Sequence, residues 1–236
     1  MTLAGARIAV TRPEPGELGE RLAALGATVV HVPLIEIGEP LDGGTALRQA
    51  LARLGAFDWL VVTSANGARR AGPAAADHPT VRLAAVGPAT ASALAAVAGR
   101  DTDLVPVLAQ AEGLLAEFPR QPARVLLAQA DRARRVLADG LAAMGHHVES
   151  VVAYRTAIRT PSGEEIARLR DVDAVVLASG SAAAGWAAID PPSGAIVVAL
   201  GPVTASAATE RGVRVDHVAA SPDAAAVSDL LARVVP

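Results

Sequence analysis

Short apolar runs alternate with amphipathic segments along the whole chain of 236 residues. The runs are continuously apolar instead of alternately apolar and polar, which is typical of parallel strands buried on both faces. The pattern predicts strands at residues 8–10, 29–32, 60–62, 83–86, 104–107, 125–127, 148–152, 175–177, 196–200 and 213–218.

Two of the connecting segments carry apolar side chains at the spacing of a helix. The spacing i, i+4, i+7 predicts one buried stripe per helix, formed by Leu18, Leu22 and Leu25, and again by Leu137, Leu141 and Met144. Gly26 and Gly145 follow directly, where a left-handed residue would end each helix. Alternating strands and helices predict an α/β fold of doubly wound parallel-sheet domains, of the flavodoxin or Rossmann type.

The chain also contains a duplication. Four blocks recur in the same order at offsets of about 114 to 119 residues. The clearest pair is VGPATAS at 86–92 and LGPVTAS at 200–206. The chain therefore consists of two copies of one α/β unit, each of about 118 residues, a usual size for a domain.

The residues leave the division into domains open. A cut between the two copies falls in the stretch 118–122, which contains two prolines and could serve as a linker. The stretches 29–37 and 148–158 are long and extended, and could instead carry the chain from one domain to the other and back.

The composition excludes several kinds of catalytic and binding chemistry. With 21 basic and 24 acidic residues the net charge is −3, which disfavours nucleic acid as a partner. Every basic residue is Arg, and the absence of Lys and Cys excludes a Schiff-base lysine, a P-loop lysine, a cysteine nucleophile and thiolate metal sites. The histidines show no metal spacing, and we interpret the adjacent pair His146 and His147 as surface or structural residues on opposite strand faces. We therefore expect no metal and no cofactor.

The expected setting is the cytoplasm. The sequence shows no signal-peptide pattern and no apolar stretch of membrane-spanning length, so we expect no membrane partner. No coiled-coil heptad occurs, and the amphipathic helices match their own sheets, which favours a monomer.

Candidate binding residues follow the predicted strands. Ligands of open α/β sheets bind at the carboxyl ends of strands, over helix N-termini. Arg12 follows the first strand and could contact an anion or pair with Glu14. Hydroxyl residues occupy matched positions of the two copies, namely Ser64, Thr90, Ser179 and Thr204. On the residues alone, N-capping is favoured over ligand contact for these four.

Two further positions could carry chemistry. Tyr154 is the sole tyrosine, and its phenol could donate a hydrogen bond to a leaving oxygen or act as a general acid, although a half-buried structural tyrosine is the favoured alternative. Asp131 opens a predicted helix whose arginines could meet anionic groups, although a solvated helical face is favoured there: Arg132, Arg134 and Arg135.

Six segments, taken in order, carry a family resemblance. They are IAVTRPEPGELGERLAALGATVVHVPLIEI, FDWLVVTSANGARR, AAVGPATASAL, VVAYRT, DAVVLASGSAAAGW and VALGPVTASAA. Their order and spacing resemble those of the uroporphyrinogen-III synthase family over essentially the whole chain, although no single segment is highly specific.

The resemblance implies a layout. Family members have two similar α/β domains joined by a two-stranded β-ladder, with the active cleft between the domains. Carried over to this chain, one domain comprises 1–35 and 159–236 and the other 39–153, while 34–38 and 154–158 form the ladder.

The resemblance also implies an activity. Such enzymes cyclise hydroxymethylbilane, a linear tetrapyrrole with many carboxylates, to uroporphyrinogen III, with loss of water and inversion of ring D. They use neither metal nor cofactor. Tyr154 matches the tyrosine implied to assist departure of the hydroxyl, and four residues match substrate-binding positions: Ser64, Thr90, Ser179 and Thr204. Val203 stands where some members have a second threonine, and a lysine that some place nearby is missing. A non-catalytic module that binds tetrapyrroles remains the alternative.

Overall fold

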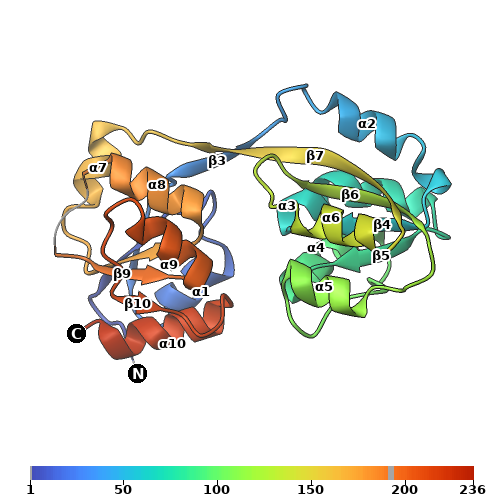
Figure 1. Ribbon diagram of the computed structural model, residues 1–236. Coiled ribbons are helices and arrows are strands. Elements are labelled where there is room, and N and C mark those ends of the chain that lie inside the picture. The colour runs from blue at the N-terminus through green and yellow to red at the C-terminus, as the bar shows by residue number, and fades with distance from the viewer. Residues whose placement is uncertain (1, 191–193) are drawn as a thin grey trace. The chain divides into compact units, whose positions relative to one another are not determined.

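The chain forms two compact units, one assembled from two separate parts of the sequence and the other from the continuous stretch between them. The computed structural model describes residues 2–190 and 194–236. Unit 1 comprises Met1–Glu36 and Ala157–Pro236, and unit 2 comprises Ile37–Thr156 (Figure 1). The stretch 118–122 lies inside unit 2, where Phe118 is buried against Trp59, so it is not a linker between domains.

Unit 1 is built on a five-stranded sheet in the order β10-β9-β8-β1-β2. The pairings β10–β9, β9–β8, β8–β1 and β1–β2 are all parallel. The strands are β1 (Arg7–Val10), β2 (Thr28–His31), β8 (Ala174–Leu177), β9 (Ile196–Ala199) and β10 (His217–Val218). The helices are α1 (Gly16–Ala24), α7 (Gly163–Arg168), α8 (Gly180–Ala188), α9 (Pro202–Thr209) and α10 (Ala224–Val234).

Unit 2 is built on a second five-stranded sheet, in the order β3-β7-β6-β4-β5. The pairings β7–β6, β6–β4 and β4–β5 are parallel. The strands are β3 (Ile35–Gly38), β4 (Trp59–Val62), β5 (Arg82–Ala85), β6 (Arg124–Ala130) and β7 (His147–Ile158). The helices are α2 (Thr45–Leu51), α3 (Ala65–Ala71), α4 (Pro88–Ala98), α5 (Ala111–Glu117) and α6 (Val136–Ala143), with 3-10 turns η1 (Leu54–Ala56) and η2 (Gly72–Asp77). The predicted α/β class with parallel sheets is confirmed.

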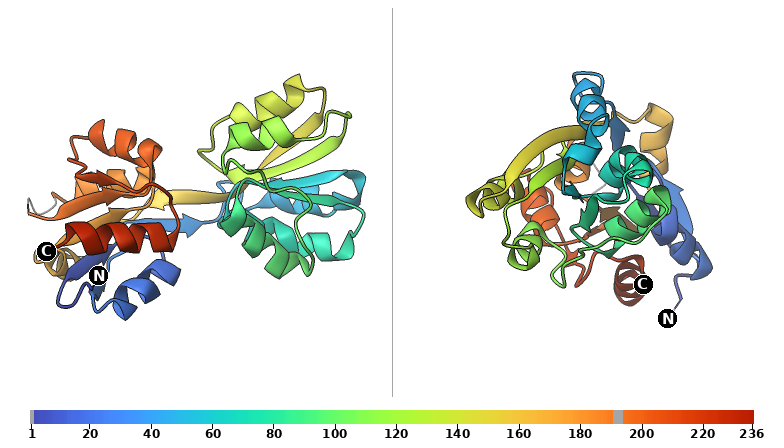
Figure 2. Two further views of the ribbon diagram at one scale, coloured as in Figure 1. Left: turned by 90° about the horizontal axis from the view of Figure 1, so that it is seen from below. Right: turned by 90° about the vertical axis from the view of Figure 1, so that its right-hand side faces the viewer.

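Each sheet is covered by helices on both faces (Figure 2). Along β8 the buried side chains alternate between two apolar clusters, with Ala174 and Val176 in one and Val175 and Leu177 in the other. The strands of unit 2 divide in the same way, with Leu60 and Val61 in different clusters. Burial on both faces is the physical reason for the continuous apolar runs in the sequence.

The duplication reappears as interleaved units. Strands β8 and β9 of unit 1 correspond to β4 and β5 of unit 2, and β1 and β2 correspond to β6 and β7. The first copy therefore supplies β1 and β2 to unit 1 and β4 and β5 to unit 2. The second copy supplies β6 and β7 to unit 2 and β8 and β9 to unit 1. The chain changes unit within β3 and within β7.

Two predicted strands form only in part. In the stretch 104–107 only Leu104 makes a bridge, to Ala84, and in 213–218 only the two residues of β10 are extended in a ladder. An aspartate precedes the paired residues in both cases: the Asp103 carboxylate accepts the Leu83 N–H at 2.7 Å, and the Asp216 carboxylate accepts the Val197 N–H at 2.9 Å. In 213–218 the pairing starts only after Asp216, whereas in 104–107 it ends after Leu104.

The ends of the two repeated helices follow the predicted geometry. Gly26 and Gly145 both have φ of +92°, the left-handed region that glycine adopts without strain. The N–H of Ala27 bonds to the carbonyl of Leu22 at 3.0 Å, which with the Gly26 bond completes a Schellman turn after α1. The predicted start of the other helix at Asp131 is wrong, because α6 begins only at Val136.

Candidate active site

The predicted site residues lie at the carboxyl ends of the strands in each sheet. Arg12 follows β1, Ser179 follows β8 and Thr204 lies just after β9, and these three strands are neighbours. We call these strand ends of unit 1 the unit-1 rim. Ser64 follows β4, Thr90 lies just after β5, and Tyr154 lies opposite the last residue of β6. We call these strand ends of unit 2 the unit-2 rim. Parallel pairing brings the carboxyl ends of neighbouring strands together, so the arrangement follows from the sheet order.

The two serines cap helices. Ser64 Oγ accepts the N–H of Gly67 at 3.1 Å at the start of α3, and Ser179 Oγ accepts the N–H of Ala182 at 3.2 Å at the start of α8. Both residues are extended, with φ near −160°, as N-cap residues are. The capping interpretation is therefore confirmed for the serines.

The two threonines do not cap helices, so the capping interpretation is wrong for Thr90 and Thr204. The N-caps of α4 and α9 are Gly87 and Gly201, each followed by a proline, and the threonines occupy the third helical position. Proline favours the first helical turn and sets the helix start before the threonine. Thr90 is 9% exposed and Thr204 is 7% exposed, and neither hydroxyl makes a hydrogen bond within the part of the chain that the structure describes.

The helix starts beside the threonines differ between the two rims. A Cβ placed on Gly87 would lie 3.0 Å from Cβ of Ala109, because the segment after Leu104 passes over the start of α4. At Gly201 the same atom would meet nothing within 4 Å. The start of α9 is therefore open, and Val203 beside it is 72% exposed.

A β-bulge determines which face of the sheet Tyr154 occupies. Gln129 of β6 pairs with Val152 of β7, but the next residue, Ala130, pairs with Tyr154, so Ala153 is skipped. Val152 points outward, whereas Ala153 and Tyr154 both join the same buried cluster beside α3. Regular alternation would have placed Tyr154 on the opposite face from Ala153. The ring is 8% exposed, and its hydroxyl has no hydrogen-bond partner among the described residues.

Several arginines near the strand ends have no carboxylate partner among residues 2–190 and 194–236. They are Arg12, Arg132 and Arg155, and the Nε of Arg155 is buried without a hydrogen bond. Glu14, the alternative partner expected for the Arg12 side chain, does not pair with it. The backbone carbonyl of Arg12 accepts the His31 ring N–H at 2.9 Å.

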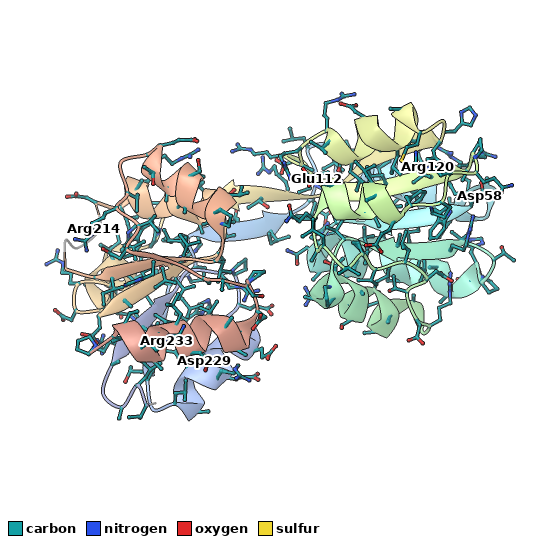
Figure 3. All side chains as sticks on the ribbon, turned by 60° about the horizontal axis from the view of Figure 1, so that its bottom comes forward. Asp58, Glu112, Arg120, Arg214, Asp229 and Arg233 are labelled. Carbon is teal, nitrogen blue, oxygen red and sulfur yellow. The ribbon has the colours of Figure 1, made fainter. Side chains whose placement is uncertain are left out.

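The other two arginines after Asp131 are engaged elsewhere. Arg134 pairs with Glu112, labelled in Figure 3, at 3.3 Å, and Arg135 pairs with Asp139 at 3.1 Å. Their mostly exposed side chains agree with the predicted solvated face. No group of three metal-ligating side chains occurs in the part of the chain that the structure describes. In the same part, no helix is both long and apolar enough to cross a membrane.

The fold defines a class: an interleaved, two-unit α/β protein whose strand ends carry hydroxyls and arginines without a carboxylate partner among the described residues, which are groups able to bind anions. A family model described as uroporphyrinogen-III synthase HemD matches residues 16–229. The chain belongs to this uroporphyrinogen-III synthase family, and the resemblance found in the sequence is confirmed.

Individual proteins support the assignment. A uroporphyrinogen-III synthase from Synechococcus elongatus is 33% identical over an alignment of 172 positions that covers 68% of this chain and 63% of that relative. The match thus spans somewhat less than two thirds of the relative's length. A mutant uroporphyrinogen III synthase from Thermus thermophilus superposes with a TM-score of 0.61 at 22% identity, over 97% of this chain and 98% of the other. The synthetase from Helicobacter pylori gives 0.68 at 16% identity, over 97% and 99%. At these identities the two structures show a shared fold.

Proposed function

We propose that this protein is a uroporphyrinogen-III synthase, a lyase that cyclises hydroxymethylbilane to uroporphyrinogen III with loss of one water and inversion of ring D. The family match over residues 16–229 carries the proposal. The chemistry of the rims is compatible with it, because the reaction needs anion contacts and a hydrogen-bond donor and no redox partner.

The substrate's carboxylates define what the rims must supply. A linear tetrapyrrole with acetate and propionate groups needs many separate anion contacts. Arg12 at the unit-1 rim and Arg132 and Arg155 near the unit-2 rim are guanidinium groups that no protein carboxylate occupies among the described residues. The hydroxyls of the largely buried residues Thr90 and Thr204 and the helix starts beside them add neutral donors.

Tyr154 is proposed to assist departure of the hydroxyl. Its phenol donates a hydrogen bond to the hydroxymethyl oxygen, which leaves as water after gaining a proton, and the resulting cation is delocalised over the pyrrole system. Ring closure later releases a proton from a pyrrole carbon, so protons and electrons balance without a cofactor. The Tyr154 hydroxyl has no partner among the described residues and is available for this bond, while its ring is held in an apolar cluster.

Control of the isomer is the larger task of the protein. Without an enzyme the bilane closes to the type I isomer, so the enzyme has to hold the chain in the conformation that leads to type III. Many separate contacts with the substrate suit this role, because positioning alone can supply several kcal/mol of the barrier difference.

The test is a coupled assay in which hydroxymethylbilane is generated in place, the product is oxidised, and type I and type III porphyrins are separated. We expect type III in excess over the uncatalysed type I product. Type I alone at the uncatalysed rate would refute the proposal, and tetrapyrrole binding without rate enhancement would identify a binding module instead.

The variant Tyr154→Phe tests the residue. We expect turnover to fall about 100-fold, a usual size for loss of a general acid, while the folded state is retained. The matched control is Val152→Ala on the outward face of the same strand, where 37% of the side chain is exposed. This control should keep its turnover. Unchanged turnover in Tyr154→Phe would leave the tyrosine a structural role only.

We also propose that the protein acts as a cytoplasmic monomer. The apolar stripes of α1 and α6 are buried within their own units, which leaves these helices no apolar face for a second copy. Sedimentation in solution tests the oligomeric state, and cell fractionation tests the compartment.

A further inference from the structure

The segment that carries Tyr154 runs past the end of its neighbouring strand. β6 ends at Ala130, directly after the bulge, while β7 continues to Ile158. Beyond Tyr154, which pairs with Ala130, β7 therefore has no regular partner strand on the β6 side, while β3 borders its other side. The contacts that replace β6 then help to hold the segment that carries the tyrosine.

Asp131 supplies those contacts with one backbone group and one side-chain group. Its backbone N–H donates to the carbonyl of Tyr154 at 3.0 Å, and its Oδ1 accepts the N–H of Thr156 at 3.3 Å. In a regular parallel ladder one residue bonds to the carbonyl and to the N–H of two residues that flank its partner. The Asp131 carboxylate thus takes the place of the missing backbone carbonyl and extends the ladder by one step.

The geometry points to Asp131 as a positioning residue for Tyr154, a role that rests on the function proposed above. The carboxylate holds the Thr156 N–H on the side of β7 that β6 no longer covers, while β3 borders the other side, and so it helps to fix the direction of the phenol two residues earlier. The residue itself is exposed and touches no atom of the tyrosine ring in the contacts described, so it acts through the backbone.

Three variants separate this role from others. Asp131→Ala removes the acceptor for Thr156 N–H but keeps the backbone bond to Tyr154. Asp131→Asn keeps an acceptor oxygen and removes the charge. Asp139→Ala is the matched control, because it removes an exposed carboxylate of the neighbouring helix that pairs with Arg135 and does not contact β7.

Two measurements read the effect. The sole tyrosine allows 3-fluorotyrosine labelling, so the fluorine NMR spectrum contains a single line from Tyr154. We expect Asp131→Ala to shift or broaden this line, and Asp131→Asn and Asp139→Ala to leave it close to that of the unsubstituted protein. In the coupled assay Asp131→Ala should lower kcat about tenfold with KM within about twofold, and Asp131→Asn should recover most of the loss.

A double substitution shows that the effect passes through the tyrosine. Asp131→Ala should lower kcat no further in a Tyr154→Phe background, whereas a general structural role would give additive losses. An unchanged fluorine line in Asp131→Ala, an effect on KM alone, or a failure of Asp131→Asn to recover would each overturn the inference. The fluorine spectrum does not depend on turnover, so it still decides the inference if the unsubstituted protein forms no type III product.

Discussion

His146 offers a quantitative test of how the interior of unit 2 is packed. The residue lies in the turn after α6 and is only 5% exposed. Its ring meets the edge of the Phe118 ring at 5.0 Å between centroids, with an interplanar angle of 81°. Neither Nδ1 nor Nε2 has a hydrogen-bond partner within the described residues. The side chain is therefore a polar group held in an apolar position.

The energetic balance predicts that His146→Leu is stabilising. A buried polar group without a partner costs about 1–3 kcal/mol. The substitution gives up the aromatic contact with Phe118, which is worth about 0.5–1.5 kcal/mol. The volume is nearly conserved, so no large cavity opens. We expect the free energy of unfolding at pH 7.5 to rise by about 1 kcal/mol.

The gain should grow as the pH falls. Burial lowers the pKa of His146 below the ordinary value of 6.5; the carbonyl of Pro119 opposes this to a smaller extent, although it makes no hydrogen bond of regular geometry with the ring. Below 6.5 the unfolded chain takes up a proton at this position before the folded protein does, so the native state loses stability until the pH reaches the lowered pKa. The difference between the variant and the unsubstituted protein should therefore widen by up to about 1.4 kcal/mol for each pH unit in that window.

Urea unfolding at several pH values between 5 and 8 measures both effects. His147→Leu is the control, because it makes the same replacement at the neighbouring histidine, which is exposed at the start of β7. A His146→Leu variant that is less stable at pH 7.5, or that loses stability with acid as steeply as the unsubstituted protein, would refute the reasoning.

Three further predictions concern helix capping, packing and substrate binding. Ser179→Ala should lower the free energy of unfolding by about 1 kcal/mol in urea unfolding, and Ser179→Asn should restore it because asparagine also caps helices. Gly185→Ala should lower the free energy of unfolding by about 1–2 kcal/mol, because the new Cβ would lie 2.9 Å from both Cβ and the carbonyl oxygen of Leu34. Gly163→Ala is the control: its new Cβ would meet nothing within 4 Å, so it should be neutral or slightly stabilising in the same experiment. Arg12→Ala should raise KM for hydroxymethylbilane about tenfold with little change in kcat, and an unchanged KM would remove Arg12 from the binding site.

Local patterns determine which contacts of the candidate residues can be predicted from the sequence. Ser64 and Ser179 follow apolar strands and precede helices, so their capping role is readable from neighbouring residues alone. The Gly-Pro pairs before Thr90 and Thr204 were the local sign that those helices start earlier. The role of Asp131 had no such sign, because its carboxylate bonds to Thr156, which is 25 residues away in the sequence.

The sequence by itself determined the α/β class, the duplication and the strand ends at which the candidate residues lie. These features depend on the periodicity of apolar side chains and on residues close in the chain, such as the glycines that end α1 and α6. Tertiary structure decided which copy supplies which strand to each sheet, because strand order depends on pairing between distant segments. It also decided the face on which Tyr154 lies. One skipped residue in the pairing of β6 with β7 reverses that face, and no local pattern of apolar and polar residues records such a skip.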